Sequence, residues 1–192
     1  MKTRNTIIII LLMLGIGLFT VVQGWIIPQQ EQDKQRYIME QQSPLTHDIG
    51  SVLKFKSKYM GDFSNFDNLI SSLPLNRVDR SYQLYPEQLT AQINYEETVL
   101  GIGQERVELG LIYNATAAFA LIDNLEGINF NFMDVDYQVK RQDVENWYGT
   151  TLSALLVEDT WGAKVQEKLA DDEYVLSCSK ALLSKSKIQP AS

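Results

Sequence analysis

The sequence predicts an α+β domain, built as one mostly antiparallel sheet packed by several helices and preceded by an N-terminal transmembrane helix. Three observations lead to this fold class. An uncharged run covers residues 7–27. Several later segments, such as residues 89–96, alternate strictly between apolar and polar side chains, which is typical of half-buried strands. Residues 108–125 are apolar nearly all round, which indicates a helix packed on more than one side.

The uncharged run has the length of a membrane span. It contains 21 residues, interrupted only by Thr20 and Gln23 and closed by Pro28. A helix needs roughly 20 apolar residues to cross the hydrocarbon core. Lys2 and Arg4 precede the run, and positive flanks stay in the cytoplasm. We therefore expect a cytoplasmic basic end at 1–6, a signal anchor at 7–27 and the rest of the chain outside, as a single-pass protein of the cell membrane.

A cleavable signal peptide is the alternative interpretation of the same residues. Lys2 and Arg4 would form its basic region, and Val22-Gln23-Gly24 would supply the small residues of a cleavage site. An apolar region of a signal peptide usually has about 7–15 residues, whereas this one continues to Gln23. Trp25 then prefers a bilayer interface. We favour the anchor; cleavage after Gly24 would make the domain a secreted protein.

The exported part is acidic and has one cysteine. All 24 acidic residues but only 15 of the 17 basic ones follow residue 27, which gives a net charge of −9. Nucleic acid binding needs clustered lysine and arginine, so we expect no nucleic acid partner. Cys178 has no second cysteine to pair with. We expect it at an apolar position of a helix rather than as a reactive thiol.

Composition divides the exported part into three segments. Residues 28–44 are rich in glutamine and poor in apolar side chains, so they predict a linker, either a helical stalk or a flexible tether. Residues 45–170 form the α+β domain. Residues 171–192 form a C-terminal helix and tail, with Asp171, Asp172 and Glu173 at its start and lysines toward its end, as a helix dipole favours.

The first part of the domain predicts two helices. Residues 45–60 carry a helical and a strand pattern at once, and we prefer a helix ending before Gly61. Ser64 or Asn65 is expected to cap a second helix, which Pro74 stops.

Alternation then predicts the sheet. Residues 89–96 form a strand whose partner contains Tyr82 and Leu84, with Pro86 in the turn between them. Residues 128–132 and 135–139 alternate in two phases, so they predict a hairpin or one bulged strand.

The remaining helices are predicted from glycines and caps. Gly127 is expected to stop the long apolar helix, and Gly149 to end a short helix with Val144 on its apolar face. Asp159 or Thr160 is expected to cap a further helix. Its inward side chains would be Trp161, Val165 and Leu169.

Several motifs resemble a known family. The Gly61-Asp62 turn is followed by a short helix ending in Leu73-Pro74, and residues 144–149 end in Tyr148-Gly149. In this order they resemble the bacterial domain-of-unknown-function family numbered four-eight-two-five, over roughly residues 45–169. The resemblance implies a membrane-tethered or secreted domain. It also implies a link to sensing, because some members are joined to antirepressor-type metallopeptidase sensors of beta-lactams.

The sequence lacks the residue sets of common enzymes. His47 is the single histidine, so a zinc site or a Ser-His-Asp triad would depend on it; a surface or capping role is expected instead. Residues 101–104 lack the remaining glycine of a dinucleotide fingerprint and the lysine of a phosphate loop, which indicates a turn. Acid pairs remain at 96–97, 134 with 136, and 171–173. Asn131, Asp134 and Asp136 lack the full pattern of a calcium loop, so we expect a solvated hairpin turn there. We therefore assign no catalytic, cofactor-binding or metal residues, and no cofactor.

These observations favour a non-enzymatic module for sensing, binding or interaction at the cell envelope. Two alternatives remain open. The chain could be an accessory subunit of another membrane or envelope protein, contacted through residues 28–44 or the tail helix. It could also be a cell-envelope hydrolase that uses only carboxylates.

Overall fold

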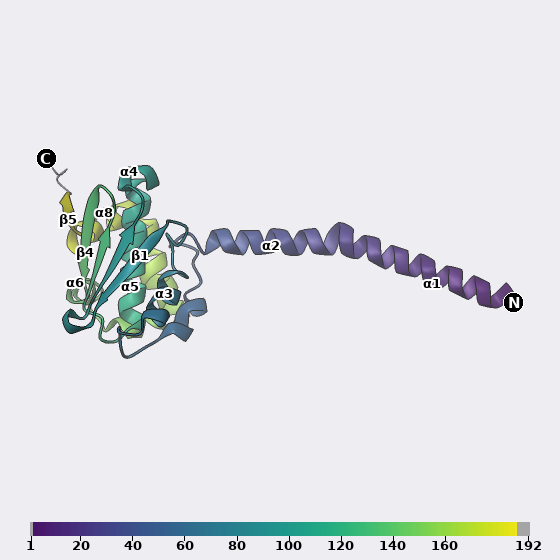
Figure 1. Cartoon of the computed structure of the whole chain (residues 1–192), viewed down its shortest axis with the longest axis horizontal. Coiled ribbons are helices and arrows are strands. Elements are labelled where there is room, and N and C mark those ends of the chain that lie inside the picture. Colours follow the sequence, from purple (N-terminus) through teal and green to yellow (C-terminus); the bar gives the residue numbers. More distant parts are fainter. Residues whose placement is uncertain (1, 188–192) are drawn as a thin grey trace. The chain divides into compact units, whose positions relative to one another are not determined.

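The computed structural model describes residues 2–187, which divide into two units between Glu40 and Gln41. The first unit is helical throughout. It consists of α1 (Lys2–Val21), a π-helical turn η1 (Val22–Ile26) and α2 (Ile27–Glu40), as Figure 1 shows. Within it, Leu11–Glu40 is long and apolar enough to cross a membrane. The predicted N-terminal helix is therefore confirmed as a helix with the properties of a membrane span.

The sequence predicts that the helix ends before Pro28, but the helix continues to Glu40. Proline lacks an N–H and its ring clashes with the carbonyl four residues earlier, which here belongs to Gly24. Gly24 lies in the π-helical turn, where the N–H of Ile27 bonds to the carbonyl of Val22 instead. The wider turn accommodates the proline ring. Most of the predicted linker is thus a helical stalk.

The second unit contains one five-stranded sheet in the order β1-β2-β3-β4-β5. All neighbouring strands are antiparallel except β2 and β3. The predicted, mostly antiparallel sheet packed by helices is confirmed (Figure 1). The elements in chain order are η2 (Ile49–Phe55), α3 (Phe63–Ile70), β1 (Arg80–Tyr85), η3 (Pro86–Gln88), β2 (Thr90–Tyr95), α4 (Val99–Ile102), α5 (Gln104–Leu121), β3 (Gly127–Asn131), β4 (Val135–Lys140), α6 (Arg141–Tyr148), η4 (Leu152–Leu156), α7 (Glu158–Trp161), η5 (Gly162–Gln166), η6 (Lys168–Ala170), α8 (Asp172–Leu182) and β5 (Ser184–Lys187).

Helix α5 forms the centre of the core and makes the parallel pairing possible. Parallel strands need a long crossover connection, and α5 provides it between β2 and β3. It is buried on all sides from Val107 to Leu121 apart from Leu109, as the sequence predicts. It ends at Leu121, however, and Gly127 opens β3 instead of stopping the helix. A Cβ at Gly127 would lie 3.1 Å from Oγ1 of Thr90, so the glycine allows the two strands to approach.

The helix expected over residues 45–60 is wrong. Only the 3₁₀ segment η2 forms there, and Ser57 then makes a parallel bridge with Ile122. The bridge fits the strand alternation that the same residues carry. Helix α3 is capped by Asp62, whose side chain accepts from the N–H of Asn65 at 3.0 Å, and not by Ser64 or Asn65.

The C-terminal elements confirm the apolar pattern but not all the boundaries. Gly149 ends α6 with a φ of +63°, as predicted. The next helix begins at Glu158, after an extended Val157, and is not capped by Asp159 or Thr160. The helix continues as the π-helical turn η5 and the 3₁₀ segment η6. Trp161, Val165 and Leu169 are buried, as expected. Asp171 caps the tail helix α8, and β5 follows without having been predicted.

Candidate functional site

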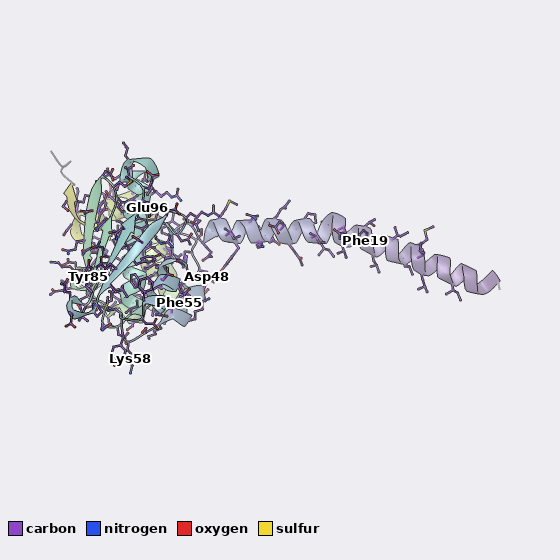
Figure 2. All side chains as sticks on the ribbon, in the orientation of Figure 1. Phe19, Asp48, Phe55, Lys58, Tyr85 and Glu96 are labelled. Carbon is purple, nitrogen blue, oxygen red and sulfur yellow. The ribbon has the colours of Figure 1, made fainter. Side chains whose placement is uncertain are left out.

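The sheet has one buried and one open face. In β2 the side chains of Ala91, Ile93 and Tyr95 are buried, whereas the alternate side chains point away from the core. Helices α5 and α8 lie behind the sheet (Figure 1), and the inward strand residues pack with α5 in one core. Tyr85 and Glu96, labelled in Figure 2, mark the two ends of the β1–β2 hairpin. The open face is left to contact solvent or a ligand.

The strand register arranges the open side chains into rows that cross the sheet. We call these residues the amide face, because six of the ten residues in its two longer rows are carboxamides. One row is Ser81, Asn94, Asn131, Asp136 and Ser186; the second is Gln83, Gln92, Asn129, Gln138 and Ser184; a shorter third row is Tyr85, Thr90, Gly127 and Lys140.

Hydrogen bonds between the carboxamides fix this surface. Nδ2 of Asn131 donates to Oδ1 of Asn94 at 3.0 Å, and Nε2 of Gln92 donates to the same oxygen at 2.7 Å. On the next row, Nε2 of Gln138 donates to Oδ1 of Asn129 at 3.1 Å. Each carboxamide has two donors and an acceptor with two lone pairs. The bonds therefore hold the side chains in place while leaving further donors and acceptors for a ligand.

Asp136 lies in a shallow depression at the β5 side of the amide face. The depression has a volume of about 390 Å³, and Asn129, Asn131, Gln138 and Ser184 are among its lining residues. Oδ1 of Asp136 is buried and accepts no hydrogen bond from the residues that the structure describes. Burial raises the pKa of this carboxyl group. Asp136 is the single carboxylate among the residues that line this depression.

His47 does not have the surface or capping role expected from the sequence. Its side chain is buried and joins the core behind the sheet. Nδ1 lies 2.9 Å from the hydroxyl of Tyr113, and Nε2 lies 2.8 Å from the carbonyl of Ser72. Burial lowers the pKa of His47, although the Ser72 carbonyl and Asp48 act in the opposite direction. This arrangement stabilises a neutral imidazole in a structural position.

Cys178 occupies the position that the sequence predicts. It is buried on α8, and burial raises the pKa of its thiol to about 12. A thiol with a raised pKa is a weak nucleophile at neutral pH.

Two residues of the acid pairs in the sequence bind N–H groups at the starts of helices. Asp134, expected in a solvated turn, accepts from the N–H of Val99 at 2.8 Å, at the first residue of α4, whose N-cap is Thr98. Asp171 is the N-cap of α8 and accepts from the N–H groups of Glu173 and Tyr174. Residues 101–102, expected in a turn, form the end of α4. Within residues 2–187, no three histidine, cysteine or acidic side chains form a group able to hold a metal ion.

The amide face was not identified from the sequence, although part of its signal is visible there. Gln92 with Asn94, and Asn129 with Asn131, are the polar positions of two alternating segments. Alternation alone predicts a wet face. The pairing of Asn94 with Asn131 depends on the parallel register of β2 and β3, which alternation does not determine.

No curated protein and no solved structure matches the chain. A family model does match, over residues 52–143, and its description is "Domain of unknown function (DUF4825)". The matched segment extends from η2 into α6 and includes β1 to β4 with α5, and therefore all of the amide face except Ser184 and Ser186 of β5. The match confirms the family resemblance that the sequence motifs indicate: residues 52–143 are similar to this family of unknown function.

Proposed function

We propose that this protein is a membrane-anchored, extracytoplasmic binding module without catalytic activity, and that its amide face binds an uncharged glycan of the cell envelope. The observation that carries the proposal is the composition of the rows. They contain five, five and four residues, and only Asp136 and Lys140 among them are charged. Solubility alone favours a surface with about a quarter to a third charged side chains of both signs. An uncharged, hydrogen-bonded surface instead suits an uncharged polar ligand.

Glycans match the donors and acceptors of this surface. Sugar hydroxyls both donate and accept, as do carboxamides, and the acetamido groups of amino sugars can pair with carboxamides directly. Neighbouring strands lie about 4.8 Å apart, which is close to the length of one sugar ring. A glycan lying across the strands would therefore place successive rings over successive side chains of a row. At the edge of the sheet, Tyr85 offers an aromatic ring.

The proposed location follows from the first unit. Leu11–Glu40 has the length and composition of a membrane span, and Lys2 and Arg4 favour a cytoplasmic N-terminus with the domain outside. An uncleaved anchor would hold the amide face within reach of the envelope. Cleavage after Gly24 would instead release a soluble binding module.

The alternative of a carboxylate-based hydrolase has less support. Glycoside hydrolysis generally uses two carboxyl groups about 5–9.5 Å apart across the scissile bond. Asp136 is the single carboxylate among the residues lining the depression on the amide face. The geometry favours binding of a glycan over its cleavage.

The test compares glycan binding by the full-length protein in nanodiscs with that of two variants. The probe is a set of short N-acetylglucosamine oligosaccharides, and calorimetry gives the Kd. The Asn94→Ala/Asn131→Ala double variant removes two adjacent carboxamides of one row. Net hydrogen bonds contribute about 0.5–1.5 kcal/mol each, so with one lost bond per carboxamide we expect Kd to rise roughly 5- to 150-fold.

Asn68→Ala is the matched control, because Asn68 is an exposed carboxamide on α3, outside the amide face. It should leave Kd unchanged. Equal binding by the double variant and by the wild type would refute the proposal, as would the absence of binding to any of the oligosaccharides.

A further inference from the structure

A groove with an apolar floor lies between the start of α5 and the helix α8, away from the amide face. It has a volume of about 580 Å³, and its floor includes Leu109, Leu169 and Val175. Two further leucines at the groove, Leu45 and Leu176, are 40% and 55% exposed. Apolar side chains gathered at a groove and left in contact with water are typical of a protein-binding site.

The walls of the groove are held in a fixed position by a buried carboxylate. Glu108 of α5 accepts from the hydroxyl of Ser179 at 2.6 Å, from Nε2 of Gln104 at 2.8 Å, and from the ammonium group of Lys185. Burial opposes ionisation of Glu108, but these hydrogen bonds outweigh it, and the pKa of the carboxyl group is lowered. Because α5, α8 and β5 are tied together here, the groove is preorganised.

The rim of the groove is acidic. Glu105 and Asp172 line it, are exposed, and form no ion pair with any residue in the described part of the chain. An adjoining depression of about 340 Å³ shares Leu109 and Glu105 and extends the surface along α5, with Arg106 at its edge. An elongated apolar surface with acidic sides is complementary to an amphipathic helix that carries basic residues beside its apolar stripe.

We propose that this groove docks a basic amphipathic helix of a partner protein. The groove includes Leu45, which follows the end of α2 by only five residues in the chain, so the proposed partner is another membrane protein. The apolar stripe of its helix would cover Leu109, Val175 and Leu176. Its lysines or arginines would pair with Glu105 and Asp172. This interaction is independent of the amide face and uses the opposite side of the molecule.

The test uses the full-length protein in nanodiscs of zwitterionic lipid and two labelled synthetic peptides. Both peptides are helical with the same apolar stripe, but one carries lysines beside it and the other glutamates. Fluorescence anisotropy gives each Kd, and empty nanodiscs measure binding to the lipid. We expect the lysine peptide to bind at least tenfold more tightly than the glutamate peptide.

Three variants separate the groove from other surfaces. Leu176→Asp should weaken binding of the lysine peptide at least tenfold, and thermal unfolding checks that this exposed position tolerates the change. The charge reversal Glu105→Lys/Asp172→Lys should shift the preference toward the glutamate peptide. Leu53→Asp is the control, because Leu53 is also 40% exposed but lies on η2, outside the groove.

Equal binding of the two peptides, or an unchanged Kd in Leu176→Asp, would overturn the proposal. The Asn94→Ala/Asn131→Ala variant, which tests the amide face, should bind the lysine peptide as the wild type does. The two sites can therefore succeed or fail separately.

Discussion

Replacing Tyr113 by phenylalanine removes one oxygen atom from the centre of the core. The hydroxyl lies 3.1 Å from Nε1 of Trp161 and 2.9 Å from Nδ1 of His47. The side chains of all three residues are buried. The indole N–H can only donate, so the hydroxyl accepts from Trp161 and donates to His47. Nε2–H of His47 is then free to donate to the carbonyl of Ser72.

The size of the effect follows from the number of atoms left without a partner. Tyr113→Phe leaves two buried polar atoms unpaired, the indole N–H and Nδ1 of the imidazole. Each costs about 1–3 kcal/mol, so the free energy of unfolding should fall by about 2–6 kcal/mol. For a unit of this size, about 2–4 °C of Tm is lost per kcal/mol. We therefore expect Tm to fall by about 4–24 °C, measured by the fluorescence of Trp161 and the other tryptophans in the full-length protein.

Tyr59→Phe makes the same chemical change at a side chain that is 69% exposed. Surface substitutions usually stay within about 0.5 kcal/mol, so this variant measures the effect of the substitution alone. If Tyr113→Phe lost no more stability than Tyr59→Phe, the hydrogen-bond chain would not contribute to stability, and the reasoning would be refuted.

Three further predictions concern stability. Because the folded-state pKa of His47 lies below its ordinary value of 6.5, the unfolded state binds the proton more readily. The stability that neutral His47 contributes is therefore complete above pH 6.5 and is lost as pH falls through the folded-state pKa. His47→Gln should reduce the dependence of stability on pH, which is measured as the urea midpoint at a series of pH values. Arg141→Met removes the guanidinium that donates to the carbonyls of Phe119, Ile122 and Leu125, in the last turn of α5 and just after it, and should cost at least about 2 kcal/mol in urea unfolding. Gly149→Ala places a Cβ at a φ of +63° and should cost about 1–2 kcal/mol in the same assay. At both Gly149 and Gly61 the new Cβ would have no other atom within 4 Å, but the φ of Gly61 is not positive, so Gly61→Ala should cost less.

Local patterns were sufficient to predict most of the sheet. In β1 to β4, which are five or six residues long, successive side chains point alternately to the core and to the open face. This two-residue period can be recognised without knowing which strands pair. Gly149 could be predicted as a helix end because a left-handed residue there favours glycine. β5 was missed because Ser184 to Lys187 carry no alternation of apolar residues; the strand forms by pairing with β4.

The features that sequence reasoning missed depend on residues distant in the chain. His47 and Tyr113 are 66 positions apart, and Asn94 and Asn131 are 37 apart. His47 lies next to Asp48 at the start of the domain, and the neighbouring residues in the sequence do not indicate that its side chain is buried. The π-helical turn before Pro28 was missed for a different reason: proline predicts a helix end unless an upstream carbonyl moves out of its way.

Helix α5 explains why one small domain can present two unrelated surfaces. Its crossover places β2 and β3 side by side and in parallel, and this register brings Asn94 and Asn131 into one row on the open face. The same helix supplies Glu108 and Leu109 to the groove on the other side. A substitution buried inside α5, such as Ala117→Leu, should therefore disturb both surfaces through overpacking, while Asn94→Ala and Leu176→Asp should each affect one. Ala117→Leu is expected to lose glycan binding and peptide binding together, whereas Asn94→Ala should retain peptide binding and Leu176→Asp should retain glycan binding. This pattern would show that packing of the helix supports both surfaces.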